Sequence, residues 1–251
     1  MAWSKTYRGD EPQRVNKWLA HEGVCSRREA EDLIGRGLVS IDGTRVEDVG
    51  RKIECGQTLT LADVGRPAIT VVVNKPVGFV SAQPEAGQTP AARLVVRANL
   101  FEGAMPEVDK NTRLAPLGRL DQDSHGLLLL SEDGVLAKAV IGPESKLDKE
   151  YRVRVAGQIS DRKLALLRHG LALDGRKLKP ARVSLTGEHQ IKFVLTEGRN
   201  RQIRRMCELV DLEVTDLLRV RIGPLRLGAL PEGKWRPLAP PERDALVRDS
   251  H

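Results

Sequence analysis

The chain has few aromatic residues, few cysteines and no long hydrophobic run. Only eight of its 251 residues are Trp, Tyr or Phe, too few for a protein that stacks each base of a single strand on its own ring. The three cysteines are far apart and the five histidines are scattered, so neither a disulfide framework nor a cysteine zinc site is expected. The densest apolar runs, Val71–Val73 and Leu127–Leu130, are far below the ~20 residues of a membrane span. Since no signal peptide opens the chain either, we expect a cytoplasmic protein.

Positive charge is in excess and is unevenly distributed. The net charge is +7, from 41 Lys and Arg against 34 Asp and Glu. Residues 1–67 contain 11 of each sign, so residues 68–251 carry the whole excess. A basic excess indicates an anionic partner. If that partner is a nucleic acid, the larger C-terminal part supplies much of the attracting field.

The first sixty residues follow the pattern of two short helices and a small sheet. Residues 1–11 are polar without a period and are expected to fray. Apolar residues then recur at helical spacing, and Ser26-Arg27-Arg28-Glu29 is a capping box that predicts the start of a second helix. A strand over residues 38–41 and a hairpin turn at Asp42-Gly43 follow.

This segment resembles a known RNA-binding domain. Residues 14–61, with Ser-Arg-Arg-Glu-Ala followed by Gly-Leu-Val-Ser-Ile-Asp-Gly, are similar to the small α-L domain found in a small-subunit ribosomal protein. The resemblance implies that Arg27 and Arg28 face RNA phosphate, while the residues alone also fit a solvated first helical turn. We assign this domain to residues 12–65 and a linker to residues 63–68.

The next segment places an acidic turn before a buried strand. Residues 69–73 are an apolar run that predicts a buried strand, and residues 84–113 lack a period, as expected of a functional or disordered surface loop. Residues 118–130 read Gly-Arg-Leu-Asp-Gln-Asp-Ser-His-Gly-Leu-Leu-Leu-Leu. Asp121 would be held at the mouth of the strand, where the scaffold fixes its direction and pKa. Without further context, an Asp-x-Asp is more typical of a turn or helix cap.

Four motifs in order point to one family. They are Asn-Lys-Pro-Val-Gly at 74–78, Gly-Arg-Leu-Asp with Gly-Leu-Leu-Leu-Leu-Ser-Glu-Asp-Gly, Lys-Glu-Tyr-Arg-Val at 149–153, and Glu-Gly-Arg-Asn-Arg-Gln-Ile-Arg-Arg-Met at 197–206. Together they resemble the pseudouridine synthases that modify ribosomal RNA, and the F-type branch most of all. That branch acts on 23S rRNA and can act on a tRNA anticodon. The loop over residues 97–114 is longer than expected for it.

The resemblance implies roles for individual residues. Asp121 would attack or stabilise the anomeric carbon or the base, as carboxylates do in glycosidases, and Arg204 would be its ion-pair partner. Tyr151 would stack on the extruded base and accept the proton from carbon 5, although its alternating strand would equally suit a core aromatic. Ile203 would pack under the base. The remaining expected contacts to substrate are from Arg119, Arg199, Arg201, Arg205 and Lys75.

Two residues of the acidic turn are expected to be structural, and two other functions stay open. Neither Asp123 nor His125 is matched to a catalytic role. A metal-dependent RNA nuclease could use Asp121 and Asp123 together with Glu132 and Asp133, because acidic clusters hold magnesium. A ribosome-assembly factor could bind RNA through its first domain without any chemistry.

The resemblance favours an enzyme with an α+β fold. It implies a small N-terminal α-L domain, a catalytic domain over residues 68–240 on a mixed, mostly antiparallel sheet flanked by helices, and a flexible tail over residues 241–251. The reaction isomerises a uridine to pseudouridine and needs no metal or cofactor. The expected partner is structured RNA, a 23S rRNA stem-loop and also tRNA, and the expected state is a monomer with no obligate protein partner.

Overall fold

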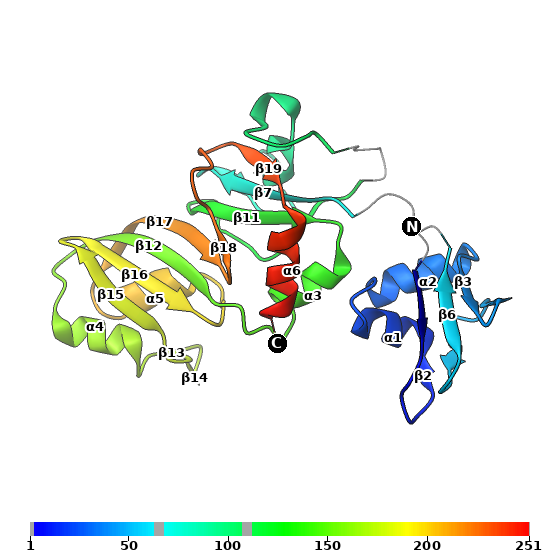
Figure 1. Ribbon diagram of the computed structural model, residues 1–251. Helices are drawn as coiled ribbons and strands as arrows, with labels where there is room; N and C mark the ends of the chain where they lie inside the picture. Colours follow the sequence, from blue (N-terminus) through cyan, green and yellow to red (C-terminus); the bar gives the residue numbers. More distant parts are fainter. Residues whose placement is uncertain (1–2, 63–67, 107–111, 251) are drawn as a thin grey trace. The chain divides into compact units, whose positions relative to one another are not determined.

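The computed structural model describes residues 3–62, 68–106 and 112–250, and the chain divides into two units. One unit is Met1–Ile69 with Glu132–Lys138, and the other is Thr70–Ser131 with Ala139–His251 (Figure 1). We call them the N-terminal and the C-terminal unit. Most of the predicted linker, residues 63–67, lies outside the described residues. None of the described helices is long and apolar enough to cross a membrane.

The N-terminal unit packs two helices, α1 (Val15–His21) and α2 (Arg27–Gly35), with a small antiparallel sheet. The predicted capping box begins α2, since Ser26 accepts from the Glu29 N–H and Glu29 accepts from the Ser26 N–H. The strands are β1 (Trp3–Thr6), β6 (Thr58–Leu61), β3 (Val39–Ile41) and β4 (Thr44–Arg45), in that order, with a separate pair of β2 (Gln13–Arg14) and β5 (Lys52–Ile53).

The prediction that residues 1–11 fray is wrong for residues 3–7, while residues 1–2 lie outside the described residues. Residues Trp3–Thr6 pair antiparallel with β6, and the Trp3 and Tyr7 rings lie edge-on to Trp18, at centroid distances of 5.9 and 5.2 Å. The buried aromatic Trp18 thus recruits two rings from the segment that precedes the helices. The residues between Trp3 and Tyr7 are polar, so the sequence shows no apolar pattern that would predict strand β1.

The C-terminal unit is built on a nine-stranded mixed sheet. Its main path runs β15-β16-β12-β17-β11-β7-β19, all neighbours antiparallel except the parallel pair β11 and β17. The strands are β7 (Thr70–Lys75), β10 (Ala115–Pro116), β11 (His125–Ser131), β12 (Lys149–Ala156), β15 (Arg182–Gly187), β16 (Gln190–Leu195), β17 (Glu213–Ile222), β18 (Leu225–Arg226) and β19 (Trp235–Pro237). Two small pairs lie outside it: β8 (Phe79–Val80) with β9 (Thr89–Pro90), and β13 (Ala172–Leu173) with β14 (Arg176–Lys177).

Helices complete this unit. They are α4 (Asp161–Arg168), α5 (Gln202–Glu208) and α6 (Pro240–Arg248), whereas α3 (Gly134–Ile141) belongs to the N-terminal unit up to Lys138 and to the C-terminal unit from Ala139. Helices α4 and α5 pack with strands β12, β15, β16 and β17 around a common hydrophobic core (Figure 1). The predicted flexible tail is instead helix α6: Leu246 is fully buried, and Glu242 accepts hydrogen bonds from Arg236 and from the Ala239 N–H. The sequence of α6 is rich in charged residues, so it gives no sign that Leu246 is buried.

The irregular segment after β7 is only partly a loose loop. It contains the short 3-10 helices η1 (Ala91–Leu94) and η2 (Arg97–Asn99). The buried Trp235 indole donates to the Val96 carbonyl at 2.9 Å, and the Phe101 N–H donates to the Trp235 carbonyl at 2.9 Å. A residue more than a hundred positions away therefore orders a segment that has no pattern of its own.

Candidate active site

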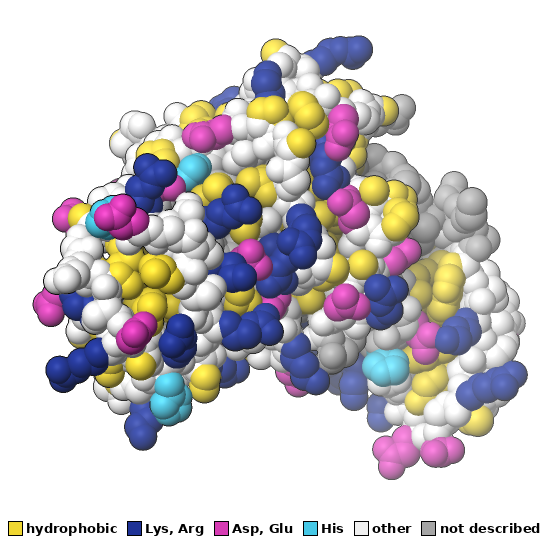
Figure 2. Space-filling view, turned by 60° about the vertical axis from the view of Figure 1, so that its left-hand side comes forward, with side chains coloured by type: hydrophobic (Ala, Val, Ile, Leu, Met, Phe, Trp, Pro, Cys, Tyr) yellow, Lys and Arg dark blue, Asp and Glu magenta, His cyan; other side chains and the backbone are white. Residues whose placement is uncertain are grey.

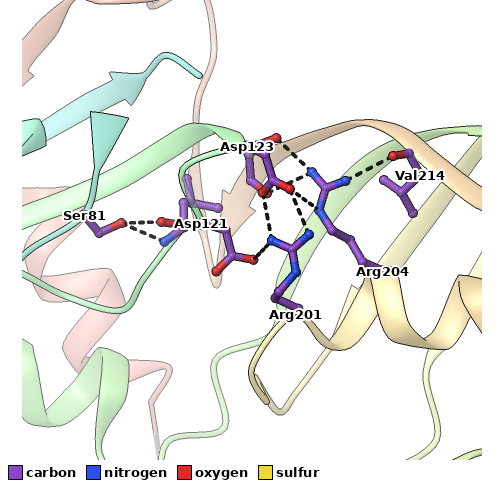
Figure 3. A network of polar contacts seen from close by, with 8 residues as sticks. Ser81, Asp121, Asp123, Arg201, Arg204 and Val214 are labelled. Atoms are coloured by element: carbon purple, nitrogen blue, oxygen red, sulfur yellow. Dashed lines mark hydrogen bonds and ion pairs between the residues drawn. The ribbon is translucent and has the colours of Figure 1, made fainter. Parts of the chain in front are cut away.

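Hydrogen bonds hold the backbone of the turn that carries Asp121 on both sides of this residue. It connects β10 with β11, and the buried Ser81 hydroxyl both donates to the Leu120 carbonyl at 2.7 Å and accepts from the Leu120 N–H at 2.8 Å (Figure 3). The Ser124 N–H donates to the Asp121 carbonyl at 3.1 Å. Because the backbone on either side of Asp121 is fixed, the direction of its carboxylate is restricted before any ligand binds.

Position 126, just after the acidic turn, has room only for glycine. Its φ is +105°, and a Cβ there would lie 2.4 Å from the Arg219 carbonyl oxygen and 2.8 Å from the Arg219 nitrogen. Only glycine combines this backbone conformation with such a close approach of β11 to β17. The contact sets the distance between the acidic turn and β17.

Two arginines of the basic motif converge on the acidic turn. Arg201 Nη1 lies 3.6 Å from Asp121 Oδ2, and the Arg201 guanidinium binds both carboxylate oxygens of Asp123, at 3.2 and 2.9 Å (Figure 3). Arg204 contacts Asp123 instead of Asp121, with Nε 3.3 Å from Asp123 Oδ2. The prediction that Arg204 is the ion-pair partner of Asp121 is therefore wrong in this structure, where Arg201 has that position.

Arg204 has a structural reason to lie where it does. Its side chain is buried in α5, and its two terminal nitrogens donate to the Val214 carbonyl at 3.1 Å and the Asp123 carbonyl at 2.8 Å. It thereby joins the acidic turn to β17. Arg201 can reach Asp121 because it caps α5 in a left-handed conformation, φ +48°, which turns its side chain out of the helix.

Asp123 holds the two arginines in place. Partial burial alone would raise the pKa of Asp123, but hydrogen bonds from Arg201 and the charges of Arg204 and Arg201 outweigh burial and lower that pKa below its ordinary value of 3.8. The carboxylate is therefore charged at neutral pH. This supports the expected structural role of Asp123.

Asp121 lines a cleft of about 880 Å³ within the C-terminal unit. Its other walls include Tyr151 of β12, Ile203 and Arg204 of α5, and Arg219 of β17. Strand β12 alternates as predicted: Val153 and Val155 are buried, whereas Arg152 and Arg154 are exposed. Tyr151 shares the face of the two valines and stays half-buried at the end of the core, so its ring borders the cleft. Figure 2 shows Lys and Arg side chains gathered on this unit around a hollow with acidic and apolar side chains.

The predicted substrate contacts divide into two groups. Arg119, Arg199 and Arg201 line the cleft together with Ile203. Arg205 is not among the lining residues and forms a bidentate pair with Asp174, at 3.0 and 2.6 Å. Arg199 does line the cleft, but its guanidinium also donates to the carbonyls of the β13–β14 hairpin.

The prediction that Lys75 contacts the substrate is not supported by its position. Lys75 is fully buried, does not line the cleft, and donates to the Pro76 and Phe79 carbonyls at 2.8 and 2.7 Å. Burial lowers its pKa to about 8, against the opposing attraction of Asp123 and Asp121. Lys75 therefore closes the turn after β7, next to the acidic turn.

Two models of known families match this chain. The family model described as RNA pseudouridylate synthase matches residues 69–209, which include the acidic turn, Tyr151 and the basic motif, and the S4 domain model matches residues 13–59.

The chain belongs to the RNA pseudouridylate synthase family.

Relatives and a solved structure cover nearly the whole chain. The dual-specificity RNA pseudouridine synthase RluF of Salmonella typhi is 34% identical over 241 residues, 93% of this chain and 78% of the relative. The ribosomal large subunit pseudouridine synthase B of Bacillus subtilis is 35% identical over 239 residues, 92% of this chain and 93% of the relative. A crystal structure of pseudouridylate synthase, 25% identical, aligns with a TM-score of 0.64 over 93% of this chain and 99% of that chain.

Membership confirms the predicted fold and reaction class. The chain is an RNA pseudouridine synthase, an isomerase that converts uridine in RNA to pseudouridine, with an S4 RNA-binding domain and a mixed, mostly antiparallel catalytic sheet. In that S4 domain, Arg27 and Arg28 are exposed in the first turn of α2.

The nuclease hypothesis fails on geometry as well as on family. The strand β11 separates Asp121 and Asp123 from Glu132 and Asp133, and its seven residues span about 23 Å. The carboxylates of Asp121 and Asp123 face arginines instead. His125, whose Nε2 lies 2.9 Å from Asp216 Oδ1, is not among the cleft-lining residues.

The sequence motifs do not mark every residue of the cleft, and Lys149 and Arg219 are two of the unmarked ones. Lys149 and Arg219 line the cleft on either side of Tyr151, Lys149 two positions earlier on β12 and Arg219 directly opposite on β17. Alternation along β12 could have indicated Lys149, which must share a face with Tyr151. Arg219 carries no comparable signal, because its position depends on strand pairing across nearly seventy residues.

Proposed function

We propose that this synthase modifies a uridine in a structured loop of 23S rRNA and that it can also act on a tRNA anticodon. The relatives support this: one carries a name that specifies the ribosomal large subunit, and another is named as dual-specificity. The two are equally similar to this chain, so the identity values do not favour one specificity. We propose a cytoplasmic enzyme, because its rRNA and tRNA substrates are found there.

The observation that carries the mechanism is the position of Asp121 at the rim of the cleft, 3.6 Å from Arg201 and on a fastened turn. In the reaction, the bond between N1 and C1′ breaks, the base rotates, and a bond between C5 and C1′ forms. Asp121 acts as the carboxylate that attacks or stabilises the electron-poor centre that this cleavage creates. The Arg201 guanidinium favours the charged carboxylate and fixes its orientation.

Tyr151 and Ile203 form the surface on which the target base binds. Both line the cleft, and the Tyr151 ring lies against the hydrophobic core, which restricts its movement. A uracil extruded from the RNA stacks on this ring, with Ile203 packing beneath it. The Tyr151 phenol then takes the proton that C5 loses after the new bond has formed, and N1 regains a proton.

The RNA backbone is held by arginines at the cleft and by the S4 domain. Arg119 is exposed and lines the cleft, as does Arg199, so both can bind phosphates that flank the target. Arg27 and Arg28 supply a second contact with RNA phosphate. Arg205 is left out, because its guanidinium is occupied by Asp174.

Pseudouridine mapping tests this proposal. We expect a strain that lacks the protein to lose one or more pseudouridines in 23S rRNA or tRNA. The wild-type gene should restore them, and a gene carrying Asp121→Asn should not. An unchanged set of pseudouridines in both RNAs would overturn the substrate assignment. Restoration by Asp121→Asn would overturn the assigned role of Asp121.

A further inference from the structure

Three residues of neighbouring strands form the floor of the cleft beneath the expected base. Lys149 and Tyr151 lie two positions apart on β12, and their partners on β16 keep a regular register, Leu195 and Phe193. They therefore share one face of the sheet. Arg219 of β17 is paired directly with Tyr151, which places it on that face beside the ring.

Arg219 is a buried cation with a spare donor. It is 1% exposed, its Nε donates to the Leu127 carbonyl at 2.8 Å, and its Nη1 donates to the Arg119 carbonyl at 3.2 Å. Its Nη2 is buried and has no hydrogen-bond partner among the described residues. A buried guanidinium nitrogen without an acceptor is costly, and such exceptions call for an explanation.

Lys149 places a second positive charge on the same floor. Among the described residues its ammonium has one hydrogen bond, and that bond is long, 3.4 Å from Nζ to the Leu147 carbonyl. Burial and the Arg219 charge lower its pKa to about 8, against the attraction of Asp148, so it is still mainly protonated at neutral pH. No described carboxylate forms an ion pair with either Lys149 or Arg219 within the usual distance. Two like charges that line a cleft and form no ion pair among the described residues are suited to an electron-rich ligand.

The position of the two cations favours the base over a phosphate as that ligand. They lie on the sheet floor next to Tyr151, on which the base is expected to stack, whereas Arg119 and Arg201 are exposed and better placed for the backbone. When the bond between N1 and C1′ breaks, its electron pair goes to the base. The negative charge then spreads over N1 and the two carbonyl oxygens until C5 bonds to C1′.

We propose that Lys149 and Arg219 bind a carbonyl oxygen of the target uracil and stabilise its negative charge while it is detached from the sugar. The proposal rests on the assigned reaction and on the stacking role of Tyr151. The two cations act as a preorganised oxyanion site, which is effective because it is shielded from water. Arg219 also supports the turn of Asp121 through the Arg119 carbonyl, so it links the two halves of the reaction centre.

The test measures single-turnover rates and RNA affinity for the full-length enzyme, on an RNA that the wild-type enzyme converts. The variants are Lys149→Met, Lys149→Arg and, as a matched control, Lys146→Met, whose side chain is exposed and outside the cleft. We expect Lys149→Met to lower the rate by about 10²- to 10³-fold, with RNA affinity within about threefold. Lys149→Arg should keep most of the rate, and Lys146→Met should equal the wild type.

The pH profile separates this role from a structural one. The wild-type rate should fall as pH rises through about 8, where Lys149 loses its proton, and Lys149→Arg should not show that fall. The groups that affect Lys149 are Arg219 from β17 and Asp148 from its own segment, with Leu195 and Ile222 as apolar neighbours on the flanking strands. Lys75 also has a pKa of about 8, but its contribution would remain in Lys149→Arg.

Each result decides the proposal. A Lys149→Met rate equal to that of Lys146→Met would overturn it, as would a loss confined to RNA affinity, which would assign Lys149 to a phosphate. An alkaline fall in Lys149→Arg that is as large as the wild-type fall would overturn it as well. A failure of the assigned substrate shows separately, because the wild-type and Lys146→Met enzymes would then convert no 23S rRNA or tRNA fragment at all.

Discussion

Replacing Lys149 by methionine should make the protein more stable while it impairs the reaction. Methionine is close to lysine in length and fills the same space without a charge, so the aliphatic packing of Lys149 is largely kept. What changes is the burial of an ammonium group next to Arg219, which lowers the pKa of Lys149 from 10.5 to about 8. A lysine selected for stability alone would not be kept in that position.

The size of the effect follows from this pKa difference. A shift of one pKa unit corresponds to about 1.4 kcal/mol, so the charged Lys149 opposes folding by about 3 kcal/mol at pH 7. Because the folded pKa is the lower one, the unfolded chain binds more protons between pH 8 and 10.5, and wild-type stability rises with pH through that window. Lys149→Met removes the cost of burying the ammonium at neutral pH. It also removes the part of the rise in stability with pH that comes from Lys149.

The assay is thermal unfolding at pH 7 and at pH 10, with Lys146→Met as the control. We expect Lys149→Met to raise the Tm by about 6–12 °C at pH 7, since each kcal/mol shifts the Tm of a chain of this size by about 2–4 °C. The gain should shrink at pH 10. A part of the wild-type rise will remain in the variant, because Lys75 titrates in the same range. A lower Tm for Lys149→Met at pH 7 would refute the reasoning, since it would show that the ammonium stabilises the fold.

Three further predictions concern the arginines. Arg201→Asn, which tolerates the left-handed backbone at φ +48° but cannot pair with Asp121, should lower the single-turnover rate by about 10²-fold with little change in Tm. An unchanged rate would contradict the role of that ion pair. Arg205→Ala should leave the rate near the wild-type value, because Arg205 faces Asp174 outside the cleft; a large loss would restore it as a substrate contact. Replacing both Arg27 and Arg28 by alanine should weaken RNA binding and reduce the salt dependence of log K by about 2, as measured by titration at several salt concentrations; an unchanged slope would remove both from the RNA contact.

The parts of the fold with local signals could be predicted from the sequence. The capping box of Ser26 and Glu29, the hairpin at Asp42-Gly43 and the apolar strand after Asp121 are set by neighbouring residues, and the structure contains each of them. The family was also predictable, since its four motifs are contiguous stretches. What could not be predicted depends on distant partners, such as the pairing of Trp3 and Tyr7 with Trp18, or the anchoring of α6 by Leu246.

The difference between local signals and distant contacts also explains which parts of the candidate site could be predicted. Motif position placed Asp121 and Tyr151 at the cleft, but it could not determine which arginine turns toward which carboxylate. Arg201 contacts Asp121 from a backbone with a positive φ, a conformation that depends on tertiary packing and has no local signal in the sequence. The prediction for Lys75 fails for a related reason, because a lysine in a turn motif gives no sign that its ammonium is buried against backbone carbonyls.

The central claim is that a carboxylate held on a fastened turn carries out the isomerisation. The most direct measurement is pseudouridine formation by purified Asp121→Asn on the RNA that the wild-type enzyme modifies, together with the affinity for that RNA. Asparagine keeps the shape of the side chain and removes its charge. We predict a loss of at least about a thousandfold in rate with RNA affinity within a few-fold of wild type. Pseudouridine formation at the wild-type rate would contradict the account.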